Sequence, residues 1–201
     1  MNKVIILSAG HNPQAKGAEW GMQNEYDVAQ RWIQEILLYI EGHGFQVYLV
    51  STGTLPEKVA EVNEFVSAHN LSGNSIAAEL HFNAAGRQYI EGNETLYYPG
   101  SIRGRELAET YNKSFFAAAK AEVVKDRGVK EGWYKMDRPG VIDYAGDVDG
   151  NEKPDYWLRK TNCPALILEP CFLCQVGDDW VKVAHAIGRG LIAALHGNKS
   201  K

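Results

Sequence analysis

Residues 3–11 read Lys-Val-Ile-Ile-Leu-Ser-Ala-Gly-His, and they set the pattern that the following segments continue. The apolar run over 3–8 is rich in β-branched residues and is followed by glycine, which is typical of a short buried strand. A second such run occupies residues 45–51. Between them, apolar residues recur at three- and four-residue steps from Glu25 to Ile40, with Gly42 and Gly44 as stop signals beyond. This segment therefore predicts a strand-helix-strand unit.

The alternation continues along the chain. Thr54–Glu57 has the form of a capping box with proline in the first turn, which predicts a helix to about residue 69. Further strands are predicted at residues 75–82, 94–99 and 164–172, and further helices at 103 to about 125 and 178–196. We predict an α/β fold with a mostly parallel twisted sheet and helices on both faces, as one domain over 1–201. No linker or repeat indicates an appended binding module.

One segment departs from this pattern. Residues 131–157 are rich in glycine, aspartate and aromatic residues and show no clear period, so they predict a long loop or insertion. Loops of that length in compact domains tend to be functional.

Composition excludes several classes of protein. The 201 residues carry a net charge of -4 with a pI near 5.9, which argues against a nucleic-acid partner. No apolar run approaches the ~18 residues of a membrane span, and none resembles a signal peptide, so we expect cytoplasmic synthesis and no stable membrane association. We also expect a monomer. Three cysteines argue against a disulfide framework, and the pair Cys171-x-x-Cys174 is better explained by packing than by metal or redox chemistry.

Four reactive side chains fall where the predicted sheet would bind a ligand, at the carboxyl ends of its strands. His11 follows the first strand, His81 lies at the end of the third, and Glu169 lies late in the last. Glu25 opens the helix that starts at the same edge. Two imidazoles and a carboxylate suit a zinc site that leaves one position for water, and a further carboxylate can move the proton. We predict one Zn²⁺ on His11, Glu25 and His81, with Glu169 as the catalytic acid/base.

Each of these residues also has a simpler explanation. His11 could be a hydrogen-bonded loop histidine, and His81 could be a buried structural one. A carboxylate at position 25 is favoured by the helix dipole, although Glu25 heads the apolar stripe of its helix. Glu169 interrupts a continuous apolar run, where an ionised carboxylate needs a partner or a metal. Glu169 is therefore the strongest single indication of function.

The sequence resembles the zinc-dependent N-acetylmuramoyl-L-alanine amidases of the type 3 class, which occur among bacterial cell-wall hydrolases and phage endolysins. The resemblance spans nearly the whole chain. It rests on residues 6–11 (Ile-Leu-Ser-Ala-Gly-His) with Gly17-Ala18, on Glu25, on Gly44 and Val47, on 81–84 (His-Phe-Asn-Ala), on 127–129 (Arg-Gly-Val) and on 158–172, which include Asn-Cys-Pro-Ala-Leu-Ile-Leu-Glu-Pro-Cys-Phe.

This resemblance implies the same zinc ligands and the same catalytic glutamate. The implied substrate is peptidoglycan, cleaved at the amide between the lactyl group of N-acetylmuramic acid and L-alanine. Asn83 and Arg127 lie in matching motifs, and we expect both to contact the substrate. The arginine that often follows the second strand in this family is replaced by Ser51-Thr52-Gly53, and the 131–157 segment is longer than expected.

Aromatic residues in the 131–157 segment are candidates for binding glycan or peptide, because aromatic faces suit sugars. They are Trp133, Tyr134, Tyr144 and Trp157. Two alternative functions remain: a zinc peptidase that cleaves peptidoglycan stem peptides, and a metal-free peptidoglycan-binding or regulatory module. Without a signal peptide or a separate cell-wall-binding domain, the chain is expected to reach the wall after holin-type release, as a phage lysin does. A cytoplasmic recycling enzyme fits the same features.

Overall fold

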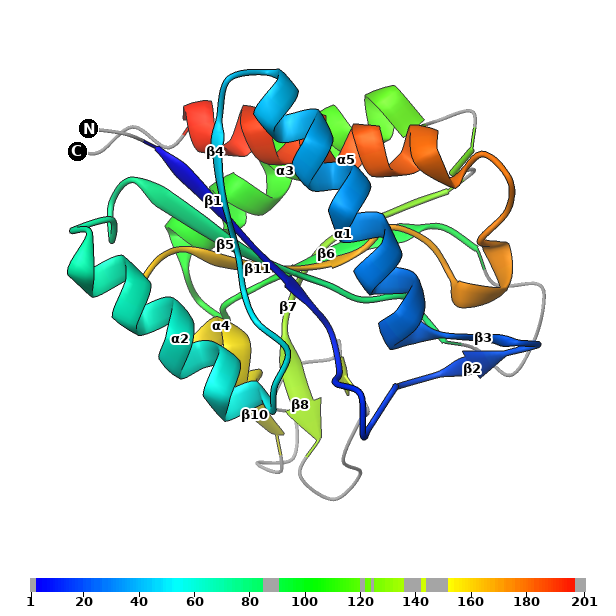
Figure 1. The fold of residues 1–201 in the computed structure, drawn as a ribbon, viewed down its shortest axis with the longest axis horizontal. Coiled ribbons are helices and arrows are strands. Elements are labelled where there is room, and N and C mark those ends of the chain that lie inside the picture. The colour runs from blue at the N-terminus through cyan, green and yellow to red at the C-terminus, as the bar shows by residue number, and fades with distance from the viewer. Residues whose placement is uncertain are drawn as a thin grey trace.

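A computed structural model of the protein describes residues 3–84, 91–119, 122–123, 125–135, 142–143 and 152–197. Its centre is a six-stranded sheet in the order β4-β1-β5-β11-β6-β7 (Figure 1). The strands are β1 (Val4–Ala9), β4 (Gln46–Leu49), β5 (Ser75–Leu80), β6 (Asn93–Tyr97), β7 (Asp126–Glu131) and β11 (Ala165–Glu169). The four strands β4, β1, β5 and β11 are parallel, β6 runs antiparallel to β11, and β7 is parallel to β6. The predicted mostly parallel α/β sheet is confirmed.

Helices cover both faces of this sheet (Figure 1). One face packs against α1 (Glu25–Gly42), α3 (Ile102–Ala119) and α5 (Trp180–Gly197), and the other against α2 (Leu55–Ala68) and α4 (Tyr156–Lys160). Alternate residues of β1 face opposite sides, with Ile5 and Leu7 in the first core and Val4 and Ile6 in the second. This two-residue period explains why a strand buried on both faces reads as a continuous apolar run. Among the described residues, no helix has the length and apolar character needed to cross a membrane.

The strand register aligns the carboxyl ends of three neighbouring strands. Leu80 on β5 pairs with Ala9 of β1 on one side and with Leu168 of β11 on the other. The residues that follow these positions therefore emerge at the same level of the sheet edge. This alignment brings residues from distant parts of the sequence into one site.

Two sequence predictions need correction. The helix expected to reach about residue 125 ends at Ala119, and residues 126–131 form the edge strand β7. That strand was missed because it is polar, only partly buried and interrupted by Gly128, which has a φ of +79°. Residues 131–157 also contain ordered elements: β8 (Trp133–Lys135), β9 (Ile142–Asp143) and β10 (Glu152–Pro154) form a second sheet ahead of α4. A small hairpin, β2 (Glu19–Trp20) with β3 (Gln23–Asn24), and the 3-10 helix η1 (Leu173–Gln175) were not predicted.

Candidate metal centre

The four predicted site residues meet at the aligned strand ends. His11 lies two residues after β1, His81 directly follows β5, Glu25 is the first residue of α1, and Glu169 is the last residue of β11. The main chain fixes their spacing, because Gly10 N donates to the Leu80 carbonyl and His81 N donates to the Leu168 carbonyl. The predicted positions of these four residues along the strands and helix are thus confirmed.

Three of these side chains converge on one point. Nε2 of His11 lies 3.0 Å from Oε2 of Glu25, and Nδ1 of His81 lies 2.9 Å from Oε1 of the same carboxylate. One ligand atom from each of the three residues lies within 4.8 Å of the others. Two nitrogen donors and one oxygen donor at this spacing fit a tetrahedral zinc site that keeps one position open.

Backbone contacts hold the Glu25 carboxylate in place. Its Oε2 accepts a hydrogen bond from Ala18 N at 3.2 Å, and its Oε1 accepts one from Phe82 N at 3.0 Å. Asn24 caps the helix by accepting from the backbone N–H of Asp27. His11 has a φ of +62°, an unusual backbone conformation for a residue with a side chain and one that clusters at functional sites. The centre is therefore preorganised by the loop after β1 and by the start of α1.

The charges of the three groups depend on one another. Burial opposes ionisation of Glu25, but hydrogen bonds from His11 and His81 outweigh it and bring the pKa of Glu25 far below its usual value. Burial likewise opposes protonation of His81, yet Glu25 and Glu79 raise the pKa of His81 well above its usual value. A cation bound here would replace protons on the imidazoles, because metal ligands must be deprotonated.

Glu169 has a different environment. The residue is 5% exposed, and burial raises its pKa to about 8. Its Oε2 has no hydrogen-bond partner within the described part of the chain. A buried carboxyl with a raised pKa and a free oxygen at the edge of a site is suited to exchanging a proton with a ligand.

Asn83 and Arg127 each have one buried donor group without a hydrogen-bond acceptor in the described part of the chain. The Nδ2 of Asn83 and the Nη1 of Arg127 are both buried and make no hydrogen bond to the described residues. Arg127 Nη2 pairs with Glu94 at 3.2 Å, and its guanidinium lies 5.1 Å from the centre of the Phe172 ring. Glu94 is the cross-strand partner of Glu169, so Arg127 stands at the same end of β11. Unsatisfied buried donors are uncommon, and their presence here suits a polar ligand.

A family model described as N-acetylmuramoyl-L-alanine amidase matches residues 5–187. The chain belongs to the N-acetylmuramoyl-L-alanine amidase family. The predicted resemblance and the fold class are thereby confirmed, and with them the activity of the family, hydrolysis of an amide in peptidoglycan. None of the curated proteins that were compared matches the chain.

Solved structures of amidases share this fold over nearly their whole length. N-acetylmuramoyl-L-alanine amidase AmiC2 of Nostoc punctiforme superposes with a TM-score of 0.72 at 21% identity, covering 96% of this chain and 97% of that one. The CwlD amidase of Clostridioides difficile, solved in complex with the GerS lipoprotein, superposes with a TM-score of 0.72 at 21% identity. The match covers 98% of this chain and 100% of that one. The catalytic domain of the CD27L endolysin, which targets Clostridia difficile, superposes with a TM-score of 0.58 at 20% identity, covering 100% of both chains.

A small cavity in this amidase lies beside the metal centre. It has a volume of about 320 Å³ and is lined by Ala18, Glu19, Trp20, Asn83, Ala84, Leu173 and Cys174. Ala18 is the residue whose N–H holds Glu25, and Asn83 lies two residues beyond His81, so the cavity adjoins the predicted ligands. Trp20 was missed from the sequence because the β2–β3 hairpin is too short to show a pattern. The only available signal was an aromatic residue before glycine in the loop between His11 and Glu25.

The aromatic residues of the 131–157 segment differ in burial. Trp157 is fully buried in the core between the sheet and α2, so the hypothesis that it contacts substrate is wrong. Trp133 is partly buried, and its Nε1 donates to Glu131 at 3.1 Å. Tyr144 and the side chain of Tyr134 lie outside the described residues. A substrate role for Trp133 and Tyr134 stays a prediction.

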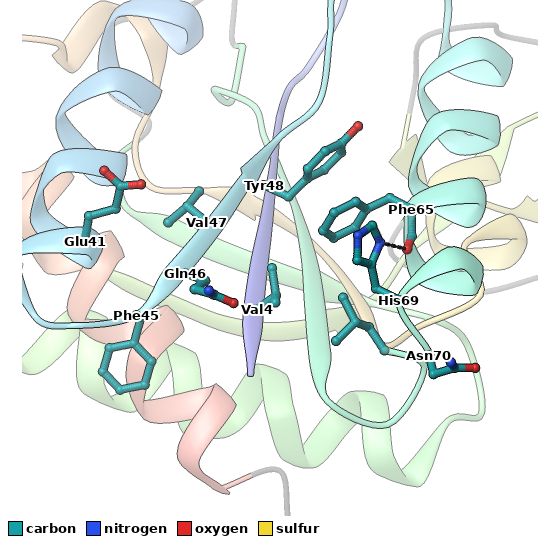
Figure 2. A pocket seen from close by; sticks show the side chains of 10 residues that line it. Val4, Glu41, Phe45, Gln46, Val47, Tyr48, Phe65, His69 and Asn70 are labelled. Carbon is teal, nitrogen blue, oxygen red and sulfur yellow. Dashed lines mark hydrogen bonds between the residues drawn. The ribbon is translucent and has the colours of Figure 1, made fainter. Parts of the chain in front are cut away.

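The three cysteines are free thiols, and one of them, Cys174, lines the small cavity beside the metal centre. Cys171 is buried in one core, as the packing interpretation of the Cys171/Cys174 pair expected, whereas Cys174 is only partly buried. Cys163 is buried in the other core, and burial raises its pKa to about 11. The second cavity, of about 860 Å³, lies at the amino ends of β1 and β4 (Figure 2). Its only drawn hydrogen bond joins His69 to the Phe65 carbonyl, and it includes none of the predicted site residues.

Proposed function

We propose that this amidase depends on one zinc ion, held by His11, Glu25 and His81, and that Glu169 is its catalytic acid/base. The observation that carries the proposal is the convergence of the three ligand atoms within 4.8 Å beside a buried carboxylate. Histidine nitrogen and carboxylate oxygen are ligands that zinc accepts, and three protein ligands leave the coordination of a hydrolytic site open. When bound, zinc would supply Lewis-acid activation of water and of the substrate carbonyl.

Glu169 moves the proton in this proposal. At its raised pKa the carboxyl would hold a proton near neutral pH in the metal-free protein. A cation nearby favours the ionised form, so Glu169 becomes a base that takes a proton from the attacking water. It then returns that proton to the amino group of L-alanine as the amide bond breaks. Both transfers use the Glu169 carboxyl, whose Oε2 has no hydrogen-bond partner among the described residues.

The substrate would lie along the edge formed by β5, β11 and the β2–β3 hairpin. Asn83 and Arg127 offer buried donors to carbonyl or carboxylate groups of the stem peptide. Trp20 offers an aromatic face at the rim of the small cavity. The assembled ligand set weighs against a metal-free binding module, and the family match favours cleavage at L-alanine over a stem-peptide peptidase.

Metal analysis and hydrolysis together test the proposal. Wild type, His81→Ala and Glu169→Ala would be compared for zinc content and for release of material from purified peptidoglycan. We expect one zinc per chain in wild type, loss of zinc in His81→Ala, and an inactive Glu169→Ala that keeps its zinc. Lys182→Met, at an exposed surface pair on α5, serves as the control. New L-alanine amino termini would identify the amidase, whereas cleavage within the stem would support the peptidase. Absence of zinc and of turnover in wild type would contradict the proposal.

We also propose that the enzyme acts on the cell wall as a lysin, after holin-type release. The proposal is supported by the fold, which is shared with the catalytic domain of an endolysin. Fractionation of intact host cells tests this, because a lysin should stay inside until a holin is expressed. Export that needs no holin would argue against it.

A further inference from the structure

Two buried charges lie next to the metal centre without a role in the proposed mechanism. Lys58 on α2 and Glu79 on β5 have side chains only 3% and 4% exposed, and Nζ lies 3.2 Å from Oε1. The sequence carried a signal for both, since Lys58 stands among the buried residues Val59, Val62 and Val66 of its helix, and Glu79 interrupts an apolar strand. The same signal had identified Glu169.

Glu79 contacts one of the two histidines. Its Oε2 lies 3.2 Å from Nε2 of His81, while Nδ1 of the same ring faces Glu25. Ser8 Oγ also donates to Oε1 of Glu79, at 3.4 Å. An imidazole that donates Nε2–H to a carboxylate presents the lone pair of Nδ1 on its opposite side. Glu79 therefore selects both the orientation and the tautomer in which His81 can bind a metal through Nδ1.

Lys58 contacts the main chain of the other histidine. Its ammonium donates to the carbonyl oxygen of His11 at 2.7 Å, to the carbonyl of Ala9 and to Glu79. These acceptors match the three hydrogens of an ammonium group. Because His11 adopts a φ of +62°, a fixed partner on its carbonyl helps to hold this unusual conformation.

We propose that Lys58 and Glu79 are positioning residues for the metal centre. Together they form one buried ion pair that orients both imidazoles. Glu79 acts through the Nε2 of His81, and Lys58 acts through the main chain of His11 and through Glu79. This inference rests on the proposed zinc site. Its competitor is a purely structural role, in which the pair only satisfies two charges buried under α2.

A set of variants separates these two roles. Glu79→Gln keeps the size and an oxygen acceptor, Lys58→Met removes the ammonium, and the double variant Lys58→Met/Glu79→Leu removes both charges. Glu35→Gln is the matched control, because Glu35 also pairs with a histidine, His185 at 2.7 Å, between α1 and α5. For each protein, zinc affinity is measured by competition with a chromogenic chelator, Co²⁺ coordination by its visible absorption spectrum, and folding by thermal unfolding without metal.

Positioning predicts a specific combination of results. Zinc affinity should fall roughly 10- to 100-fold in Glu79→Gln, as is usual for partners of metal ligands, with an altered Co²⁺ spectrum and an unchanged control. The double variant should recover the thermal stability of wild type, since no unpaired charge remains buried, while its zinc binding stays weak. A double variant with wild-type zinc affinity and Co²⁺ spectrum would overturn the inference and leave the proposed function intact. Wild-type protein that binds no zinc would overturn both.

Discussion

Gly17 lies so close to Glu25 that an added Cβ would stand 2.7 Å from Oε2 of the carboxylate. The same atom would overlap the imidazole of His11. Gly17 also has a φ of +78°, in the region that side chains disfavour. The metal centre thus requires glycine at this position both for space and for backbone conformation.

Replacing Gly17 should therefore disrupt the ligands directly. We expect Gly17→Ala to weaken zinc binding by at least roughly tenfold, a loss of about 1.4 kcal/mol in binding free energy, because Glu25 and His11 must move apart. Zinc competition measures this. Gly21→Ala is the matched control, since Gly21 has a φ of +60° but no atom within 4 Å of the added Cβ. If both variants lost zinc equally, backbone strain rather than the clash would be the cause.

Glu169 should make the metal-free protein less stable as the pH rises. Its pKa is about 8 in the folded state and 4.5 in the reference state, so between these values the unfolded chain releases a proton that the folded chain retains. Stability is therefore lost as the pH increases through this window. At about pH 9, metal-free Glu169→Gln should be more stable than wild type by a few kcal/mol, although we expect this variant to be inactive.

Urea unfolding of both proteins across the pH range provides the measurement. The two stabilities should converge below about pH 4, where Glu169 is protonated in both states. A difference between wild type and Glu169→Gln that stays constant with pH would contradict the raised pKa.

Zinc should stabilise the folded enzyme. A ligand at about 100 times its dissociation constant adds roughly 2.7 kcal/mol, which corresponds to roughly 5–10 °C in Tm for a chain of this size. We expect EDTA to lower the Tm by this amount and added zinc to restore it, in calorimetric scans. His81→Ala should show no response to either reagent. If EDTA left the Tm of wild type unchanged, the protein would hold no stabilising metal at His11, Glu25 and His81.

Trp20 should contribute to substrate binding rather than to chemistry. Its ring is 36% exposed at the rim of the small cavity, where it can cover an apolar face of the substrate. We expect Trp20→Ala to raise KM for a soluble muropeptide roughly 3- to 10-fold, about 1 kcal/mol, with kcat unchanged. Leu38→Ala is the control: Leu38 is also an exposed apolar residue but lies on α1, so this variant should leave KM and kcat unaltered. A fall in kcat with constant KM would exclude a binding role.

The sequence was most informative where burial on both faces leaves continuous apolar strands. The runs that became β1, β5 and β11 were predicted for this reason, and with them the edge on which His11, His81 and Glu169 meet. Glu25 could be placed because it heads the buried stripe of α1. Topology alone therefore assembled the candidate ligands.

What the sequence could not predict depends on contacts between elements. β7 carries charged residues because Arg127 and Lys130 pair with the buried Glu94 of β6, and such pairing leaves no alternating apolar pattern. Trp157 appeared in a polar segment, yet α4 packs it into the core beneath α2. Lys58 and Glu79 each stand among apolar neighbours in the sequence, but they pair across two elements, so the partner of each could not be identified from its own segment.

The place of β11 in the sheet has a consequence for biosynthesis. This strand comes after the other five in the sequence, yet it lies between β5 and β6. On the ribosome, β5 therefore has no neighbour on that side, and Glu169 is missing, until residues 165–169 have emerged. Strand pairing over such sequence separations is slow and leaves edges open in the meantime. A nascent chain thus carries His11, Glu25 and His81 long before it carries Glu169, so the proposed metal site and its proposed acid/base can come together only after β11 has been made and has paired with β5.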